Sequence, residues 1–199
     1  MTREQIPILP AAEAKPTRYR LLSGGYLEEK PEYMTHLSGD ILVEKTHPRI
    51  AFRGQMDALE AEALLCQMAI PALRKELQEV LDLARQLLRQ EVLEQSLPPW
   101  KLGGMDDADL RSHSHRPQDF YGQPHFMPSV EDGETVLRLN LLRTRVRSAE
   151  LAAAVALPER SDLLQALNRM SSYLYILMIR EKAKAGDKHW TQRESSKKF

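Results

Sequence analysis

Apolar residues recur at intervals of three and four along the first half of the chain. The recurrence starts near Arg53 and is interrupted at Pro71. These intervals place side chains on one face of an α-helix, where they pack into a core. Proline lacks a backbone N–H and crowds the preceding turn, so Pro71 predicts either one kinked helix or two abutting helices. The apolar positions of this region are Met56, Leu59, Ala63, Leu64, Leu73, Leu77, Val80, Leu81, Ala84, Leu87 and Leu88.

Two further helical stretches follow in the second half of the chain. One begins after Gly133 and ends before Pro158, and the other starts at Ser161. Asp162, with Gln165 three residues later, predicts an N-cap in a capping-box-like start. The apolar positions of the two stretches are Val136, Leu137, Leu141, Val146, Ala149, Ala153 and Val155, and then Leu163, Leu167, Met170, Leu174, Leu177 and Met178.

The remaining segments divide the chain into three predicted parts. Residues 1–34 contain several prolines and two adjacent glycines with little periodicity, so we expect a flexible N-terminal arm. Residues 35–182 would form the helical bundle, in which residues 96–133 are a long loop, and residues 183–199 a basic tail. No segment shows sustained two-residue alternation of strand-forming residues, so the predicted class is all-α.

Charge and cysteine content narrow the classes of function. Lysine plus arginine number 28 and aspartate plus glutamate number 28, so no global field attracts nucleic acid or an anionic membrane. Cys66 is the one cysteine, which excludes a disulfide framework within the chain and any cluster of thiolates. No apolar run is long enough to cross a bilayer, and no signal segment is evident, so we expect a cytoplasmic protein.

A polar stripe marks the helix predicted after Gly133. Asn140, Arg143, Arg147 and Glu150 lie at i, i+3, i+7 and i+10, and so on one face. Two arginines form a permanently charged clamp suited to phosphate oxygens, and Glu150 would orient one of them. The alternative interpretation is an ordinary solvated face with an Arg147 to Glu150 ion pair.

Two other sets of polar residues indicate nucleotide or phosphate binding less specifically. On the last predicted helix, Asn168, Ser172 and Tyr175 share a face, which suits either recognition of a nucleotide or a hydrogen-bonded seam between helices. The segment from Thr35 to Asp40 with Lys45 has the residue types of a phosphate cradle, although its spacing matches neither the Walker pattern nor the dinucleotide fingerprint.

Histidines gather in the long loop at positions 113, 115 and 125. No glutamate or cysteine stands beside them at a recurring ligand spacing, so we expect no dedicated protein-bound metal.

Taken together, the motifs resemble those of the ethanolamine-utilisation corrinoid adenosyltransferases. The resemblance covers about residues 35–180, and its segments occur in the family's order. It implies a relation to the propanediol-utilisation type, whose fold is a five-helix bundle assembled as a trimer with active sites between subunits. The motifs are Thr35-His36-Leu37-Ser38, Lys45-Thr46-His47-Pro48-Arg49, Phe52-Arg53 with Asp57, Leu139-Asn140-Leu141-Leu142-Arg143-Thr144-Arg145-Val146-Arg147 with Glu150, and Leu164-Gln165-Ala166-Leu167-Asn168-Arg169-Met170-Ser171-Ser172.

The resemblance implies a role for each matched position. Arg143, Arg147 and Glu150 would be the catalytic clamp on the triphosphate, and Asp57 would pair with Arg143 across the subunit interface. The residues implied to bind ATP are Thr35, His36, Ser38, Lys45, Arg143, Arg147, Glu150 and Asn168.

At three places the sequence departs from the family pattern, and there the family's residue roles cannot be assigned directly to this chain. Ethanolamine-type members commonly carry a metal-binding cysteine cluster, and Cys66 stands alone here. The related type closes the lower face of the corrin with a phenylalanine three residues before a proline. His125 has that place before Pro128, with Phe126 next, so His125, Phe126 and Met127 are the candidate cobalamin-binding residues. Finally, serines at 148 and 172 replace an arginine and an aspartate of the propanediol type.

The implied reaction moves the 5′-deoxyadenosyl group of ATP to cob(I)alamin and releases triphosphate. Magnesium would arrive with ATP and need no protein cage. A reductase would supply electrons, and a bacterial microcompartment is a candidate location. The rival hypothesis is a non-catalytic helical adaptor that docks on a partner or a microcompartment shell through its apolar faces and basic tail.

Overall fold

The computed structural model describes residues 18–195, and the side chains of residues 18–184. Contacts divide the chain into two compact units, of which the first ends at His47 and the second begins at Pro48. The predicted boundary after residue 34 therefore falls inside the first unit. Residues 1–17 of the predicted arm and the side chains of nearly all of the predicted basic tail lie outside the described part.

The first unit is a small sheet of four strands. The strands are β1 (Tyr19–Leu21), β2 (Tyr26–Leu27), β3 (Met34–Ser38) and β4 (Ile41–Glu44), in the order β2-β1-β4-β3. β1 pairs antiparallel with β2 and parallel with β4, while β3 and β4 form a hairpin.

This sheet was not predicted from the sequence. Its strands have two to five residues, which is too short to display a two-residue period. The β3–β4 register also shifts between His36 and Ser38, which breaks the alternation further. The hairpin turns at Gly39, whose φ of 53° is the left-handed region that glycine adopts without strain.

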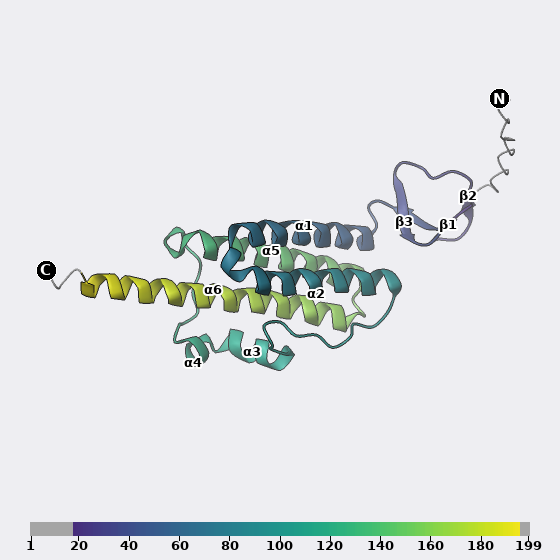
Figure 1. Cartoon of the computed structure of the whole chain (residues 1–199). Coiled ribbons are helices and arrows are strands. Elements are labelled where there is room, and N and C mark those ends of the chain that lie inside the picture. Colours follow the sequence, from purple (N-terminus) through teal and green to yellow (C-terminus); the bar gives the residue numbers. More distant parts are fainter. Residues whose placement is uncertain (1–17, 196–199) are drawn as a thin grey trace, which may run out of the picture. The chain divides into compact units, whose positions relative to one another are not determined.

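The second unit is a bundle of helices, which confirms the predominantly helical class. Its long helices are α1 (Pro48–Ala69), α2 (Arg74–Leu93), α5 (Gly133–Ala156) and α6 (Ser161–Ser195), which run side by side (Figure 1). The break at Pro71 is a single 3₁₀ turn, η1 (Pro71–Leu73), so the second of the two predicted forms, abutting helices, is correct.

The core lies between the faces that the helices turn inward. On α1 the predicted positions Met56, Leu59 and Ala63 are inaccessible to solvent, and so is Phe52 one turn earlier, whereas the predicted Leu64 is exposed. α6 is buried on most sides over its middle, from Tyr173 to Ile179, because it contacts α5, α3 and α4. A fully buried leucine or methionine contributes about 1.5–3 kcal/mol, so these faces dominate the stability of the bundle.

The predicted long loop contains two short helices. These are α3 (Asp107–His115), which packs on α6, and α4 (Pro117–Tyr121), and a 3₁₀ turn η2 (Val130–Asp132) precedes α5. α3 begins at a capping box in which the Asp106 carboxylate accepts the Asp109 N–H at 3.1 Å. It was missed because the helix has only two fully or nearly buried positions, Leu110 and Ser114, too few to establish a period.

One predicted cap is wrong. Asp162 lies in the first turn of α6 rather than before it. Its carboxylate accepts the Leu97 N–H at 2.9 Å and pairs with Arg160 at 2.9 Å. Asp162 therefore fastens the segment after α2 to the start of α6.

A buried carboxylate joins α1 to α2. Glu91 is fully buried and binds the Nε atoms of Arg49 and Arg53 at 2.5 and 2.8 Å. Both arginines belong to the motifs that carry the family resemblance. Because an ionised carboxylate without partners is very costly in a core, the pair of guanidinium groups is what permits Glu91 to lie there.

Several apolar side chains face solvent on α1 and α5, two helices that pack against each other. Leu141 and Val155, which were predicted to face the core, are 45% and 74% exposed, and Leu139 and Leu142 are buried instead. Leu151 is 71% exposed. The other exposed apolar residues on α1 are Leu64, Leu65 and Met68.

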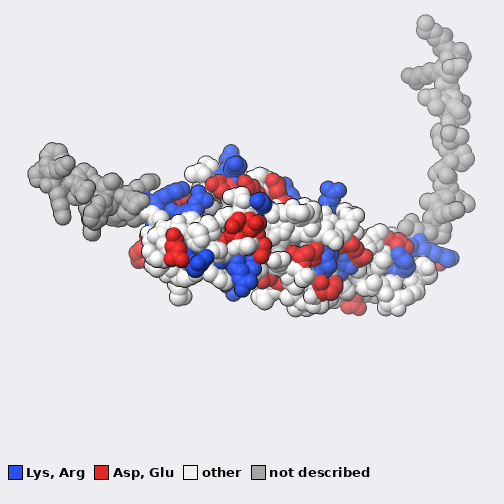
Figure 2. Space-filling view, turned by 90° about the horizontal axis from the view of Figure 1, so that it is seen from below, with Lys and Arg blue, Asp and Glu red and all other residues white. Residues whose placement is uncertain are grey.

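Charged residues are mixed on the surface drawn in Figure 2, where lysines and arginines lie among aspartates and glutamates without one extended patch of a single sign. Within residues 18–195, none of the helices has the length and apolar character needed to cross a bilayer.

Candidate active site

A surface pocket of about 440 Å³ lies where α5, α6 and the segment before η2 meet. Its lining comes from three parts of the chain that are far apart in sequence: His125 to Pro128 from the segment, Arg143 from α5 and Tyr175 from α6. The three predicted cobalamin-binding residues and one predicted clamp arginine thus lie around one cavity.

Tyr175 is the residue that connects these parts. Its hydroxyl lies 3.0 Å from the Phe126 backbone nitrogen and 3.3 Å from His125 Nδ1. Its ring is stacked with the rings of His125 and Phe126, each at 5.9 Å between centroids. The Arg143 guanidinium lies over the same ring at 5.9 Å.

The two predicted clamp arginines, Arg143 and Arg147, lie on successive turns of α5. Arg143 donates from Nε and Nη2 to Asn140 Oδ1 at 3.2 and 3.0 Å, and Arg147 is exposed on the next turn. Among the described residues neither arginine has an ion-pair partner. Partial burial, followed by the neighbouring Arg147 charge, lowers the pKa of Arg143 below its ordinary value. An anion beside them would relieve this repulsion.

Among the described residues Glu150 is bonded to an asparagine rather than to either clamp arginine. Its carboxylate accepts the Asn168 side-chain N–H at 2.9 Å, across the contact between α5 and α6. The sequence-based alternative of an Arg147 to Glu150 pair is likewise absent from the described ion pairs. The bond nevertheless brings together two of the residues predicted to bind ATP.

Asn168 is held from its other side as well. Its Oδ1 accepts a hydrogen from Arg169 Nη1 at 2.5 Å, and Arg169 pairs with Asp107 of α3 at 2.7 Å. Both ends of the amide are therefore oriented before any ligand arrives.

The remaining predicted ATP-binding residues belong to the first unit. Thr35, His36 and Ser38 lie in β3, and Lys45 follows β4, where its backbone nitrogen donates to the Tyr33 carbonyl at 2.9 Å. Lys45 is exposed, so its ammonium group is open to solvent.

The other positions compared with the family pattern are Asp57, Ser148 and Ser172. Asp57 is exposed on α1, and its pairing with Arg143 of another subunit stays a prediction. Ser148 and Ser172 donate to backbone carbonyls one turn earlier in their own helices, at 3.1 and 3.4 Å. Neither serine replaces the charge of the family residue.

Metal-binding side chains do not converge in the described residues, where no group of three His, Cys, Asp or Glu is arranged to hold an ion. Cys66 is buried in α1, with Sγ 3.6 Å from the Arg138 carbonyl, and burial raises the pKa of its thiol to about 11. His113 lies outside the pocket, with Nδ1 2.7 Å from the Tyr121 hydroxyl and its ring stacked on Phe120.

A second contact anchors the segment before α5. Lys182 pairs with Asp132 and also lies over the Phe126 ring at 4.5 Å. The Lys182 ammonium, followed by the Ser129 N–H, lowers the pKa of the Asp132 carboxyl below its ordinary value. Tyr175 and Lys182 are two helical turns apart, so one face of α6 holds Phe126 at two points.

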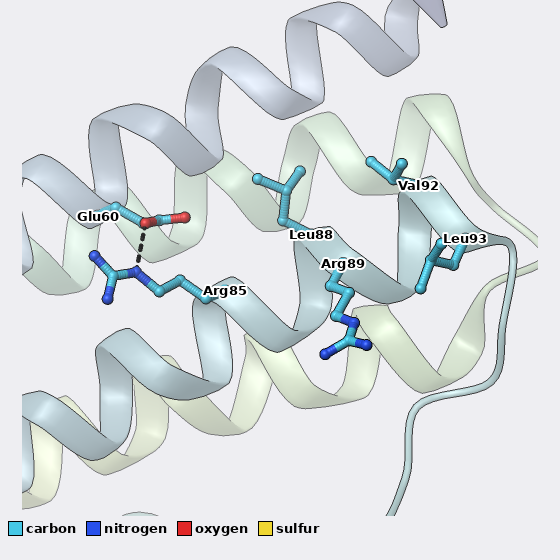
Figure 3. Close-up of a pocket in the computed structure, with 6 residues that line it drawn as sticks. All are labelled: Glu60, Arg85, Leu88, Arg89, Val92 and Leu93. Carbon is cyan, nitrogen blue, oxygen red and sulfur yellow. Dashed lines mark hydrogen bonds and ion pairs between the residues drawn. The ribbon is translucent and has the colours of Figure 1, made fainter. Parts of the chain in front are cut away.

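A second pocket of about 450 Å³ lies between α1 and α2 (Figure 3). Leu88, Val92 and Leu93 form its apolar part, and Arg85 reaches across to Glu60 at 3.0 Å. None of the predicted site residues line it.

The sequence placed Tyr175 on one face of the last helix with Asn168 and Ser172. It did not show that Tyr175 contacts His125 and Phe126, because these residues are about fifty positions away in the chain. Lys182 was missed for a different reason, since it is the last residue of the predicted bundle and directly precedes the predicted basic tail.

Comparisons with known proteins show the family to which the chain is similar. The profile of the family described as cobalamin adenosyltransferase matches residues 26–181. The corrinoid adenosyltransferase EutT of Escherichia coli (strain K12) is 35% identical over 158 residues, which are 76% of this chain and 59% of that protein. The protein of the same name from Salmonella typhimurium (strain LT2) is 32% identical over 163 residues, which are 78% of this chain and 61% of that protein.

The chain therefore spans about three fifths of the length of these relatives. No solved structure matches the chain significantly. The profile match covers both the strands from β2 onward and the bundle that holds the pocket, and from this match the chain belongs to the cobalamin adenosyltransferase family.

Proposed function

We propose that the chain transfers the 5′-deoxyadenosyl group of ATP to cob(I)alamin, giving adenosylcobalamin and triphosphate. In this step the Co(I) electron pair forms the bond to the ribose C5′ carbon. The C5′–O bond breaks, and its electrons leave with the triphosphate. No proton has to be moved at carbon, so the protein's contribution is to position the substrates and to stabilise the departing charge.

The observation that carries the proposal is the pocket shared by Arg143 and the segment from His125 to Pro128. One side of it offers a cation with no carboxylate partner in the described chain, and the other offers aromatic and apolar side chains. This pairing suits a reaction whose leaving group is a polyanion and whose other substrate is a large, partly apolar ring.

Other residues would complete the ATP site. Arg147 extends the positive surface by one turn of α5, and Asn168, already oriented by Glu150, has a side chain available to the nucleotide. Thr35, His36, Ser38 and Lys45 would wrap the triphosphate, with Mg²⁺ carried by its phosphates.

We also propose a homotrimer and a separate reductase as electron donor. The exposed apolar side chains on α1 and α5, such as Met68 and Leu151, support association of copies through these helices. Asp57 of one copy would then pair with Arg143 of the next, within the apolar interface. Reduction to Co(I) needs electrons, and we propose that a cytoplasmic reductase, in the setting of ethanolamine use and a microcompartment, supplies them.

The test is adenosylcobalamin formation by the purified protein from ATP, Mg²⁺ and chemically reduced cobalamin. We expect Arg143→Ala to lower turnover by about 10²–10³-fold, the loss typical of removing one group that stabilises transition-state charge. Circular dichroism should show an unchanged helix content in this variant, because Arg143 is outside the core.

Arg145→Ala is the matched control. It removes the same charge from the same helix, two residues away and outside the pocket. We expect its turnover to stay within twofold of wild type. Equal losses in the two variants, or full turnover in Arg143→Ala, would remove the clamp from the mechanism; absence of product with wild-type protein would refute the function.

A further inference from the structure

The Tyr175 hydroxyl has three polar groups of the pocket segment within reach. These are the Phe126 N–H at 3.0 Å, His125 Nδ1 at 3.3 Å and the Phe126 carbonyl at 3.4 Å. A phenol has one hydrogen to donate and lone pairs to accept. It therefore accepts from Phe126 N–H and donates to one of the other two groups.

The His125 ring decides which group receives the hydrogen. Its Nε2 lies 3.1 Å from the His115 carbonyl, and a carbonyl only accepts. Nε2 must therefore carry the proton, which leaves Nδ1 of the neutral ring as an acceptor. The Tyr175 hydroxyl donates to Nδ1, and in this arrangement His125 has no free lone pair with which to bind cobalt.

The face of Tyr175 makes a separate contact. Arg143 lies over the ring within the range of a cation–π interaction, while Nε and Nη2 of the guanidinium are held by Asn140. The same side chain thus orients the segment through its hydroxyl and the arginine through its ring.

We propose that Tyr175 is a positioning residue that couples the two substrate sites, so that ATP bound at Arg143 strengthens the binding of the corrinoid against His125 and Phe126. This inference rests on the proposed function and adds to it a link between the sites. By linkage, the factor by which ATP improves corrinoid affinity equals the factor by which the corrinoid improves ATP affinity.

The test measures binding without turnover. Cob(II)alamin lacks the nucleophilic electron pair of Co(I), so its dissociation constant can be measured with and without Mg-ATP. We expect Mg-ATP to tighten cob(II)alamin binding by at least about fivefold in the wild type, the lower end of common coupling factors. In Tyr175→Phe, which keeps the ring and removes the hydroxyl, we expect this factor to fall below two.

In the same variant the dissociation constant of ATP alone should stay within twofold of wild type, because the ring under Arg143 remains. Tyr175→Leu, which removes the ring too, should weaken ATP alone as well. Tyr121→Phe is the matched control, since it removes a hydroxyl that lies 2.7 Å from another histidine outside the pocket, and its coupling factor should equal that of wild type.

A measurement on the wild type is independent of how the variants fold. Imidazole nitrogen shifts in the magnetic resonance spectrum should show His125 as the Nε2–H tautomer. In Tyr175→Phe the His115 carbonyl should keep the proton on Nε2, while the Nδ1 resonance should move because that nitrogen loses its hydrogen-bond donor. A Nδ1–H tautomer in wild type, or a Tyr175→Phe variant with the full coupling factor, would overturn the inference and leave the proposed function intact. Failure of the wild type to bind both substrates would overturn both.

Discussion

Tyr173 illustrates how much a single residue depends on its neighbour in this fold. Its side chain is fully buried, and its hydroxyl has no hydrogen-bond partner among the described residues. Burial, more than the nearby Glu79 charge, raises the pKa of this phenol, so it stays neutral. The ring fits only because Gly103 faces it. A Cβ atom at Gly103 would lie 2.8 Å from both Cε2 and the hydroxyl oxygen of Tyr173.

Gly103→Ala should therefore destabilise the bundle by roughly 2–4 kcal/mol, as the sum of overpacking and of a left-handed backbone that alanine resists. The measurement is the free energy of unfolding in urea. Gly104→Ala is the control, because Gly104 has a φ of 77° but open space around it, so only the backbone cost applies. Equal losses in the two variants would mean that Tyr173 can move aside cheaply.

At the scale of elements, the connection from α2 to α6 depends on Asp162. Its carboxylate accepts the Leu97 N–H and pairs with Arg160, whose Nη2 also donates to the Gln95 carbonyl at 2.8 Å. The hydrogen bond from Arg160 is the main reason that the pKa of Asp162 falls to about 2. A carboxyl whose pKa is lower in the folded state stabilises the fold above its unfolded pKa.

The prediction is a stability difference that depends on pH. Asp162→Asn should lose about 1–3 kcal/mol at pH 6, because a partly buried charge-assisted network is broken. This difference should shrink as the pH falls from about 4 through about 2, where the wild-type carboxyl also becomes protonated. Thermal unfolding of both proteins between pH 6 and pH 2 tests it, and a constant difference across this range would contradict the role of the charge.

At the scale of the whole molecule, the proposed association of copies depends on exposed apolar side chains. Leu141, Leu151 and Val155 are 45–74% exposed on α5, although leucine and valine at these positions would gain about 1.5–3 kcal/mol each on full burial. α1 carries three more, Leu64, Leu65 and Met68. Apolar side chains gathered on a surface mark interaction sites, which supports the proposed association of copies through α1 and α5.

We expect the wild type to sediment as a trimer and Leu151→Arg to dissociate at micromolar concentration, since a charge would be buried at the interface without a partner. Leu93→Arg, which places the same charge on the exposed end of α2, should remain trimeric. Sedimentation velocity distinguishes the two variants. A wild type that sediments as a monomer would refute the proposed assembly.

Much of the bundle follows from local patterns in the sequence. The spacing from Met56 to Ala63 determines the buried face of α1, and Pro71 determines the break. The placement of Asn140, Arg143 and Arg147 on one face follows from the helical repeat alone. These features depend on neighbours three or four residues away, whose geometry in a helix is constant. The family motifs at Arg143 and Asn168 could likewise be read without a structure.

Tertiary structure decided the contacts between elements. Glu150 was expected to meet an arginine on its own helix but meets Asn168 of α6, and Leu141 was expected in the core but lies outside it. Only the packed chain brings Tyr175 to His125, fifty residues away. The period of a helix states which residues share a face, whereas the rotation and offset of two packed helices decide which side chains on those faces touch.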